Sequence, residues 1–175
     1  MYVETKNLIV REIEKKDAEI LYQLAREPNN QYYTFPNYEN PQDYLDDTEW
    51  FKEPSDSIDI CIGRYYAVVS PNSDEMIGVV ARGPKERNNE IEIGYFISEK
   101  YRRKGFAEEA VNALIEWCFK VSDIAYIYAT VSCDNLPSNK LIEKCTFELS
   151  EKRTPIKHGQ LMENKSYFYY KKHRV

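Results

Sequence analysis

The sequence has few of the residues that most often bind metals or form disulfides. Its only two histidines, His158 and His173, have no neighbour at metal-ligand spacing, which argues against a zinc site or a histidine-based catalytic triad. The four cysteines are widely separated, form no Cys-x-x-Cys pair and occupy no activating motif. We therefore expect reduced, partly buried thiols, no metal and no cysteine nucleophile.

Long apolar runs and an excess of positive charge are also missing. No run approaches the roughly 20 residues that span a bilayer, and residues 1–6 show no signal-peptide pattern, so we expect a cytoplasmic protein without a membrane partner. The formal net charge is −5 and the basic residues form no long stripe, so nucleic acid is not an expected partner. Without repeats or a linker, the 175 residues predict one domain, 1–175, with a core of about residues 6–172.

What the sequence does contain is a regular series of strand and helix patterns. Strands are predicted at residues 8–13, 65–69, 76–80, 90–97, 124–131, 147–153 and 166–171. Helices are predicted at residues 16–25, 41–51, 105–121 and 137–144. The turn formers of 70–74 predict an antiparallel hairpin, whereas the crossover through helix 105–121 predicts that its two flanking strands are parallel. A mixed sheet with helices on its faces follows, and this is an α/β fold.

The most informative segment runs from Glu90 to Val111. Strand 90–97 alternates, with Ile91, Ile93, Tyr95 and Ile97 on one face and Glu90, Glu92, Gly94 and Phe96 on the other. Helix 105–121 carries its apolar residues on one side: Ala107, Ala110, Val111, Leu114, Cys118 and Val121. Between them lies a basic, glycine-containing turn. The first helical N–H groups lack partners inside the helix and the helix dipole adds partial positive charge, so this turn predicts a phosphate site.

Four motifs in register give the chain a resemblance to a known family. They are Thr5–Arg11 as an opening T-x-R-L-x-L-R-like strand, Glu92–Tyr95 as E-I-G-Y, Arg102–Ala107 as R/Q-x-x-G-x-G/A followed by Glu109-Ala110, and Asn135, Ser138, Lys144 and Phe147 as N-x-x-S-x-x-x-x-x-K-x-G-F. This pattern resembles the GNAT superfamily of acetyl-CoA-dependent N-acetyltransferases. Within it, the chain is most similar to the branch of the ribosomal-protein alanine and serine N-acetyltransferases.

The resemblance implies a fold and a set of donor-binding residues. The fold is a mostly antiparallel mixed sheet with about four helices, in which the family's parallel fourth and fifth strands, here 90–97 and 124–131, splay apart. The cosubstrate is acetyl-CoA, and no metal is implied. The residues implied to hold it are Tyr95, Phe96 and Ile97 at the pantetheine arm, the backbone of Arg102, Arg103, Lys104, Gly105, Phe106 and Ala107 at the pyrophosphate, and Asn135.

The resemblance also implies catalytic roles, each with a simpler alternative. Glu92 is the implied general base, through a water, or else a surface carboxylate. Ser138 is the implied proton donor to the CoA thiolate, or else a helix cap, and Asn135 has the same alternative. Further hydroxyls could come from Tyr101, Tyr126 or Tyr128.

Two local features each allow two interpretations, and a third departs from the family pattern. Gly94 is either the bulge that opens the splay or a packing glycine. The aromatic group Tyr32, Tyr33, Phe35 and Tyr38 is either an acceptor-side lid or core packing. Where the family usually has a small residue and glycine, this chain has Cys145-Thr146, which predicts a less tight exit from helix 137–144.

The function expected from the resemblance is transfer of an acetyl group from acetyl-CoA to a primary amine, either a protein N-terminus or a small molecule, by direct attack. A rival is a non-catalytic module that binds acyl-CoA as a sensor or partner, and a third is a structural domain without a nucleotide ligand. We expect a monomer or homodimer.

Overall fold

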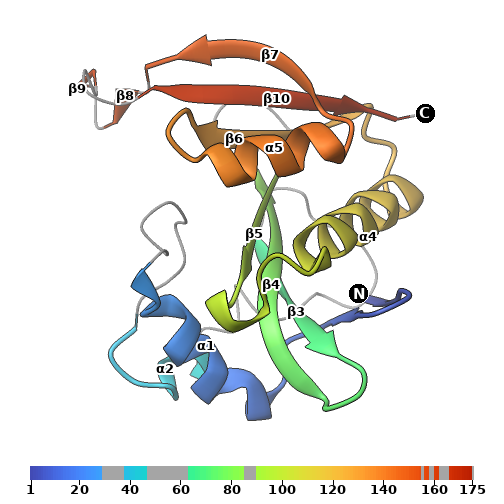
Figure 1. The fold of residues 1–175 in the computed structure, drawn as a ribbon, viewed down its shortest axis with the longest axis vertical. Helices are drawn as coiled ribbons and strands as arrows, with labels where there is room; N and C mark the ends of the chain where they lie inside the picture. The colour runs from blue at the N-terminus through green and yellow to red at the C-terminus, as the bar shows by residue number, and fades with distance from the viewer. Residues whose placement is uncertain are drawn as a thin grey trace.

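The fold is described from a computed structural model, which covers residues 1–28, 38–46, 63–84, 90–154, 156–157, 160–161 and 166–174. Its main feature is an eight-stranded sheet in the order β1-β2-β3-β4-β5-β6-β10-β7, beside a two-stranded pair of β8 and β9 (Figure 1). The strands are β1 Tyr2–Glu4, β2 Ile9–Arg11, β3 Arg64–Ser70, β4 Glu75–Pro84, β5 Ile91–Ile97, β6 Tyr126–Ser132, β7 Glu148–Arg153, β8 Ile156–Lys157, β9 Gln160–Leu161 and β10 Tyr167–His173. The helices are η1 Lys15–Asp17, α1 Ala18–Ala25, α2 Asp43–Asp46, η3 Glu99–Tyr101, α4 Phe106–Val121 and α5 Leu136–Lys144.

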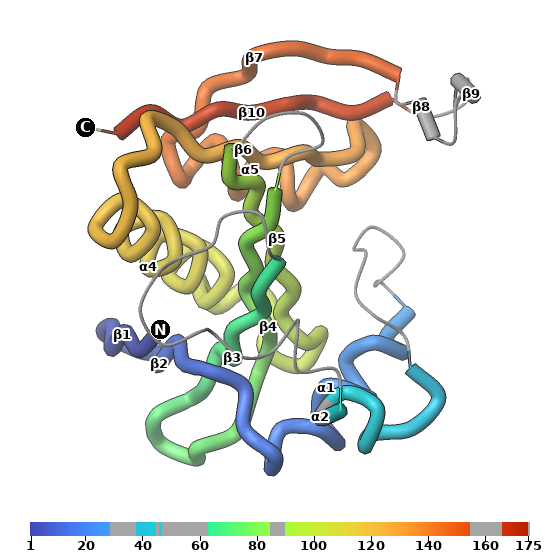
Figure 2. Tube along the Cα trace, turned by 180° about the vertical axis from the view of Figure 1, so that it is seen from behind, coloured from blue at the N-terminus to red at the C-terminus, as the bar shows by residue number. Residues whose placement is uncertain are grey.

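The sheet is antiparallel except at one place. β5 and β6 run parallel, joined by the crossover through α4, and β3 and β4 form an antiparallel hairpin. Both pairings confirm the sequence prediction, and the mixed α/β fold class is confirmed with them. Seen from the front and from behind, β6, β10 and β7 run across the ends of β4 and β5 (Figures 1 and 2). The sheet therefore turns between β5 and β6.

Several element boundaries differ from the sequence prediction. The predicted strand 8–13 is only Ile9–Arg11, and β1, which pairs with it, is not expected from the pattern. The predicted helix 41–51 contains α2, and residues 47–51 lie outside the described part of the chain. The short strands β8 and β9 lie between the predicted strands 147–153 and 166–171, and neither was predicted from the sequence.

Apolar side chains fill both faces of the sheet. The larger cluster joins the sheet to α4 and α5 and includes Ile91, Ile93 and Ile97 of β5, whereas Phe96 belongs to the second cluster, with α1 and α2. The alternation predicted for this strand is therefore confirmed. Burying each of these large side chains contributes roughly 1.5–3 kcal/mol. The two clusters fix β5 between two layers.

The long helix α4 packs as its pattern predicts, except at its end. Leu114 and Cys118 are fully buried, but Val121 is 43% exposed. Val121 is the last residue of α4 and lies between the exposed Lys120 and Asp123, so it extends beyond the covered face. None of the helices described here is long and apolar enough to span a bilayer.

Candidate active site

The central feature of the site is an opening between β5 and β6. Their parallel pairing covers only Ile91 and Glu92, opposite Ile127 and Tyr128. Both strands continue for several residues past this point without pairing to each other. The two strands therefore separate toward their carboxyl ends, as the resemblance implies.

The hydrogen-bond pattern shows which backbone groups of β5 face the opening. The amide of Ser98 donates to the carbonyl of Ile77 at 2.9 Å, so Ser98 faces β4. In an antiparallel pair, successive residues face the partner strand alternately. The backbone groups of Ile97 and Tyr95 therefore point away from β4, into the opening.

The same reasoning applies to β6 on the other side of the opening. The amide of Cys133 donates to the carbonyl of Ser166 at 2.9 Å, next to the first residue of β10. Ser132 and Thr130, one and three residues earlier, therefore direct their backbone groups toward β5. Backbone groups of both strands therefore face the opening without a β5–β6 ladder between them.

Gly94 does not bulge. The register between β4 and β5 is continuous from Gly78 opposite Ile97 to Pro84 opposite Ile91, so the bulge considered for Gly94 is wrong. The irregularity lies in the neighbouring pair, where the β3–β4 register shifts next to Val68. A Cβ on Gly78 would collide with the Phe96 carbonyl oxygen, so glycine at 78 permits the close approach of β4 to the end of β5.

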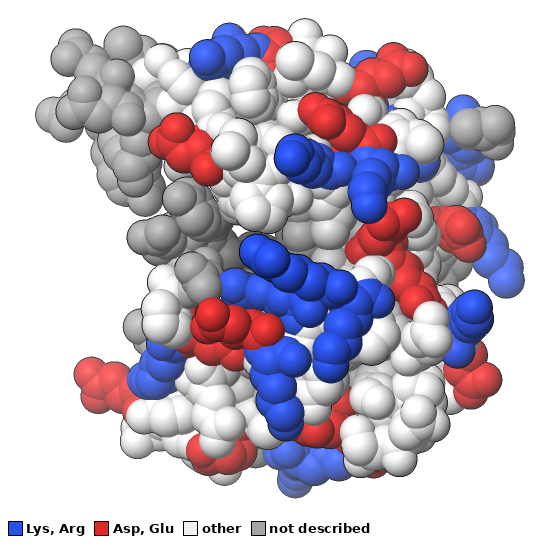
Figure 3. Space-filling model, in the orientation of Figure 1, with Lys and Arg blue, Asp and Glu red and all other residues white. Residues whose placement is uncertain are grey.

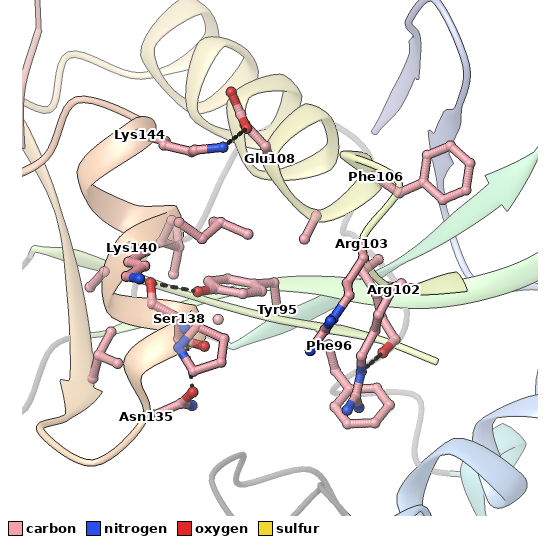
Figure 4. Close-up of a pocket in the computed structure, with 18 of the residues that line it drawn as sticks. Tyr95, Phe96, Arg102, Arg103, Phe106, Glu108, Asn135, Ser138, Lys140 and Lys144 are labelled. Atoms are coloured by element: carbon pink, nitrogen blue, oxygen red, sulfur yellow. Dashed lines mark hydrogen bonds and ion pairs between the residues drawn. The ribbon is translucent and has the colours of Figure 1, made fainter. Parts of the chain in front are cut away.

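The opening continues into a cleft of about 1020 Å³ between α4 and α5 (Figure 4). All but two of the predicted site residues line it. These are Tyr95, Phe96, Ile97, Arg102, Arg103, Gly105, Phe106, Ala107, Asn135 and Ser138. The two outside the lining are Lys104, whose ammonium lies 5.4 Å from the ring centre of Tyr101, and Glu92. The fold thus collects predicted residues from three separate segments around one space: β5, the turn that starts α4, and the start of α5.

One wall of the cleft is the turn that starts α4. Arg103 and Gly105 have φ angles of +61° and +84°, and Gly105 is the N-cap. Glycine is favoured at position 105 because of this backbone conformation. Lack of space does not require it, because a Cβ on Gly105 would meet no described atom within 4 Å. The first α4 bond runs from the Glu109 amide to the Gly105 carbonyl at 3.1 Å, so the preceding amides, including those of Phe106 and Ala107, project from the helix end. These donors suit an anion.

The side chain of Arg102 braces this turn internally. Its Nε donates to the carbonyl of Ile97 at 2.8 Å, and its Nη2 lies 3.6 Å from Oε2 of Glu27. The guanidinium carbon is 5.1 Å from the ring centre of Phe96, and Figure 4 shows the two groups together. Of the three basic residues in the motif, Arg103 and Lys104 keep exposed side chains.

Cations from two elements gather at the mouth of the cleft. Arg103 comes from the turn, while Lys140 and Lys144 come from α5, and Figure 3 shows the Lys and Arg side chains concentrated there. Lys144 lies 3.9 Å from Glu108 across the cleft. Neither lysine was among the predicted site residues, although Lys144 belongs to the fourth motif and the i, i+4 spacing of the two was a visible signal. A local cationic field in a chain of net charge −5 attracts a small anion.

The phenol of Tyr95 lies inside the cleft between β5 and α5. Its hydroxyl donates to the carbonyl of Ser138 at 3.4 Å (Figure 4). Burial raises the pKa of Tyr95 to about 12, and hydrogen bonding with Ser138 partly offsets this. The phenol is therefore protonated at neutral pH. Sequence reasoning considered only the backbone of this residue.

Asn135 and Ser138 form the start of α5. Oδ1 of Asn135 accepts a hydrogen bond from the Ser138 amide at 3.3 Å, so Asn135 is the N-cap and the structural alternative is confirmed for it. Asn139, which was not predicted, donates to the carbonyls of Ser132 and Asn135 at 3.0 Å each and accepts from the hydroxyl of Tyr170. These bonds hold the β6–α5 turn against the sheet.

The remaining predicted side chains lie outside the cleft or are engaged. Glu92 is half-buried on the β5 face of Phe96, at the last paired position. The Tyr101 hydroxyl donates to Glu75 at 2.6 Å, and that of Tyr128 donates to Glu90 at 3.1 Å. Burial and the bond with Glu90 raise the pKa of Tyr128.

Tyr126 and the aromatic group have partners of their own. Tyr126 lies under the ammonium of Lys171, 3.5 Å from its ring centre. Tyr38 packs edge-on against Tyr44, whereas Tyr32, Tyr33 and Phe35 lie outside the described residues.

The C-terminal end of helix α5 differs from the sequence prediction. Thr146 adopts φ +61°, its amide donates to the Glu143 carbonyl at 2.9 Å, and the Phe147 amide donates to Ile142 at 3.2 Å. This is the tight exit normally made with glycine, so the expected loosening is wrong.

Three cysteines, Cys118, Cys133 and Cys145, are free thiols, and Cys61 lies outside the described residues, as does His158. Burial raises the pKa of Cys145 to about 11. Within the described ranges, no cluster of three metal-ligating side chains occurs.

An opened pair of parallel strands beside a helix N-terminus is the arrangement that the resemblance to N-acetyltransferases implies, and comparison with known proteins identifies the family. The model of the acetyltransferase (GNAT) domain matches residues 7–148. The chain therefore belongs to the GNAT acetyltransferase family and is an acetyltransferase.

Individual proteins agree with this assignment. An uncharacterized N-acetyltransferase, YjdG, of Bacillus subtilis is 30% identical over 82% of this chain and 83% of its own length. The structure of a putative ribosomal-protein-serine acetyltransferase from Vibrio cholerae matches with a TM-score of 0.72 at 19% identity, over 99% of this chain and 98% of that one. A Vibrio cholerae spermidine N-acetyltransferase in complex with CoA and spermine matches with a TM-score of 0.74 at 18% identity, over 97% and 96%. At these identities the two structures show that the fold is shared.

Proposed function

We propose that this protein transfers the acetyl group of acetyl-CoA to a primary amine, on a protein N-terminus or a small molecule, by direct attack. One observation carries the proposal. The opening between β5 and β6 leaves the backbone groups of Tyr95 and Ile97 facing a cleft that also contains the N-terminal amides of α4. A molecule with an amide-containing arm and a diphosphate matches both sets of groups.

The donor would lie along this cleft in a defined direction. Its diphosphate would bind the amides of the turn ending at Ala107, supported by the helix dipole and the nearby cations. Its pantetheine arm would extend along β5, and Asn135 lines the opposite wall. The amide of Ile97 would then polarise the thioester carbonyl as negative charge develops on its oxygen.

The reaction needs a base for the amine and an acid for the thiolate. The amine nitrogen attacks the thioester carbon, so that a C–N bond forms and the C–S bond breaks. Glu92 would accept the amine proton through a water, which its position outside the cleft lining requires, and Ser138 would protonate the leaving thiolate and regain its proton from solvent. No cysteine is among the described residues that line the cleft, which supports direct attack over an acyl-enzyme.

The test is turnover with a panel of amines. Acetyl-CoA would be mixed with N-terminal peptides of ribosomal proteins, polyamines, amino acids and aminoglycosides while CoA release is followed. We expect turnover on at least one class, and Glu92→Gln and Ser138→Ala each to lower kcat by about 100-fold. Glu116→Gln, on the exposed face of α4, is the matched control.

The results separate the alternatives. No turnover on any class, together with stabilisation by CoA, would support the non-catalytic acyl-CoA module instead, although family membership argues against it. An unchanged kcat in both variants would exclude the assigned base and acid while leaving the donor site intact.

A further inference from the structure

Glu27, just beyond the end of α1, contacts the segment that leads from β5 into the basic turn at residues 102–105, called the cofactor turn below. Its amide donates to the carbonyl of Leu24 at 3.2 Å, so its backbone belongs to the last turn of α1. Its Oε1 accepts from the Ser98 hydroxyl at 2.6 Å, and its Oε2 accepts from the Glu99 amide at 2.9 Å. One carboxylate therefore holds the segment that connects β5 to the cofactor turn by two hydrogen bonds.

The same carboxylate orients Arg102. Nη2 of Arg102 is 3.6 Å from Oε2 of Glu27, and the two side chains are only 32% and 20% exposed. Water screens such a pair less than it screens an ion pair at the open surface. Arg102 in turn donates through Nε to the carbonyl of Ile97 at 2.8 Å. The chain of contacts runs from α1 through two charged groups to the end of β5.

The contacts converge on the residue proposed to polarise the thioester. Ile97 is held at its carbonyl by Arg102, and the next residue, Ser98, is held by Glu27 and by the carbonyl of Ile77. A displacement of Glu27 would therefore move the Ile97 backbone and the start of the cofactor turn together.

We propose that Glu27 is a positioning residue for acetyl transfer, acting through Arg102 on Ile97 and on the cofactor turn. The proposal rests on the proposed function. It assigns the Arg102 side chain to a brace, and it leaves the phosphate charge to the exposed Arg103 and Lys104. It also connects α1, which packs with α2 in the second apolar cluster, to the donor cleft between α4 and α5.

The test is a double-substitution cycle on the full chain. Glu27→Ala should raise the KM for acetyl-CoA and the Kd for CoA by about tenfold, the usual effect of losing a charge-assisted hydrogen bond, and should leave the KM for the amine unchanged. Glu19→Ala, an exposed carboxylate on the same helix bonded to Gln23, is the matched control. A purely structural role would lower kcat through the folded fraction and leave both constants unchanged.

The cycle shows whether the Arg102 side chain braces the turn or binds phosphate. If Arg102 acts only as a brace, Glu27→Ala should cost less in the Arg102→Ala background than in wild type, because only the bonds to Ser98 and Glu99 then remain to be lost. A phosphate-binding Arg102 instead gives additive losses. Should Glu27→Ala fail to fold, Ser98→Ala removes one of the three contacts and should raise the same two constants by a smaller factor.

The outcomes are distinct. Wild-type protein that binds CoA, with unchanged constants in Glu27→Ala and Ser98→Ala, overturns the positioning role alone. Wild-type protein that gives no binding heat with CoA overturns the proposed function and the positioning role with it.

Discussion

At the scale of single residues, the surroundings of a side chain decide its properties as much as its chemical type does. Tyr95 and Cys145 both have raised pKa values because their environment disfavours charge. Thr146 adopts a backbone conformation that its own side chain disfavours, because two helix-end amides and the Lys172 contacts hold it there.

The raised pKa of Tyr95 predicts a loss of stability in alkaline solution. The phenol is neutral in the folded state until about pH 12 but ionises near 10 when unfolded, so its contribution is complete below pH 10 and falls as the pH rises toward 12. At pH 11, wild type should have lost about 1.4 kcal/mol relative to Tyr95→Phe. Urea unfolding of both proteins from pH 8 to 11 measures the difference, and parallel curves would contradict the buried position of the phenol.

The conformation of Thr146 predicts a stabilising substitution. Thr146→Gly should raise the free energy of unfolding by about 1 kcal/mol, because relief of the left-handed conformation exceeds the added entropy of the unfolded chain. Thr146→Ala keeps the unfavourable φ and loses the hydroxyl next to Lys172, so it serves as the control. Thermal unfolding that ranks the glycine variant below the alanine variant would contradict this.

At the scale of elements, the start of α4 is anchored to the N-terminal segment. Glu109 accepts from the Thr5 hydroxyl at 2.6 Å, from the Asn7 amide at 2.7 Å and from Asn7 Nδ2 at 2.9 Å. Burial raises the pKa of Glu109, but these hydrogen bonds outweigh it and the net pKa is lowered. The carboxylate fixes the helix whose first amides form the proposed diphosphate site.

Removing this anchor should destabilise the protein in a pH-dependent way. Glu109→Gln should cost about 1 kcal/mol at pH 7 after allowance for solvent screening. Because the folded pKa is lowered, the stabilisation is present above the ordinary pKa of about 4.3 and is lost as the pH falls through the folded value. Urea unfolding at pH 7 and pH 3 should show the cost shrinking, while Glu108→Gln, the adjacent residue, should show little change at either pH. An equal cost at both pH values would rule out the charge as its source.

At the scale of the whole molecule, an acidic chain presents a cationic cleft mouth. Lys140 and Lys144 face Arg103 across it, and Figure 3 shows separate groups of acidic side chains on the surface around it. Such a field raises the local concentration of an anionic ligand and weakens with salt.

This field predicts a salt-dependent donor affinity. The double variant Lys140→Ala/Lys144→Ala should raise the KM for acetyl-CoA about five- to tenfold at low ionic strength and less at high salt, with kcat unchanged. Lys120→Ala, exposed near the far end of α4, is the control and should behave as wild type. A KM that does not change at low salt would show that these lysines do not contact the donor.

Much of the fold could be predicted from local patterns. The period-two alternation of β5, the apolar face of α4 and the crossover between them predicted the parallel pair, because these features depend on residues close in sequence. The cationic turn with Gly105 indicated the phosphate site for the same reason. Strand β1 was missed because three residues that alternate weakly give no clear periodic signal.

What the sequence determined by itself is therefore the series of elements and a short anion-binding turn, both properties of local spacing. Only the tertiary structure decided that Glu27 closes on Ser98, that Glu109 anchors Asn7, and that the phenol of Tyr95 turns inward against α5. These partners are tens of residues apart in the chain. No local period encodes which side chains meet when a sheet turns between two of its strands, so the assembled site depends on packing.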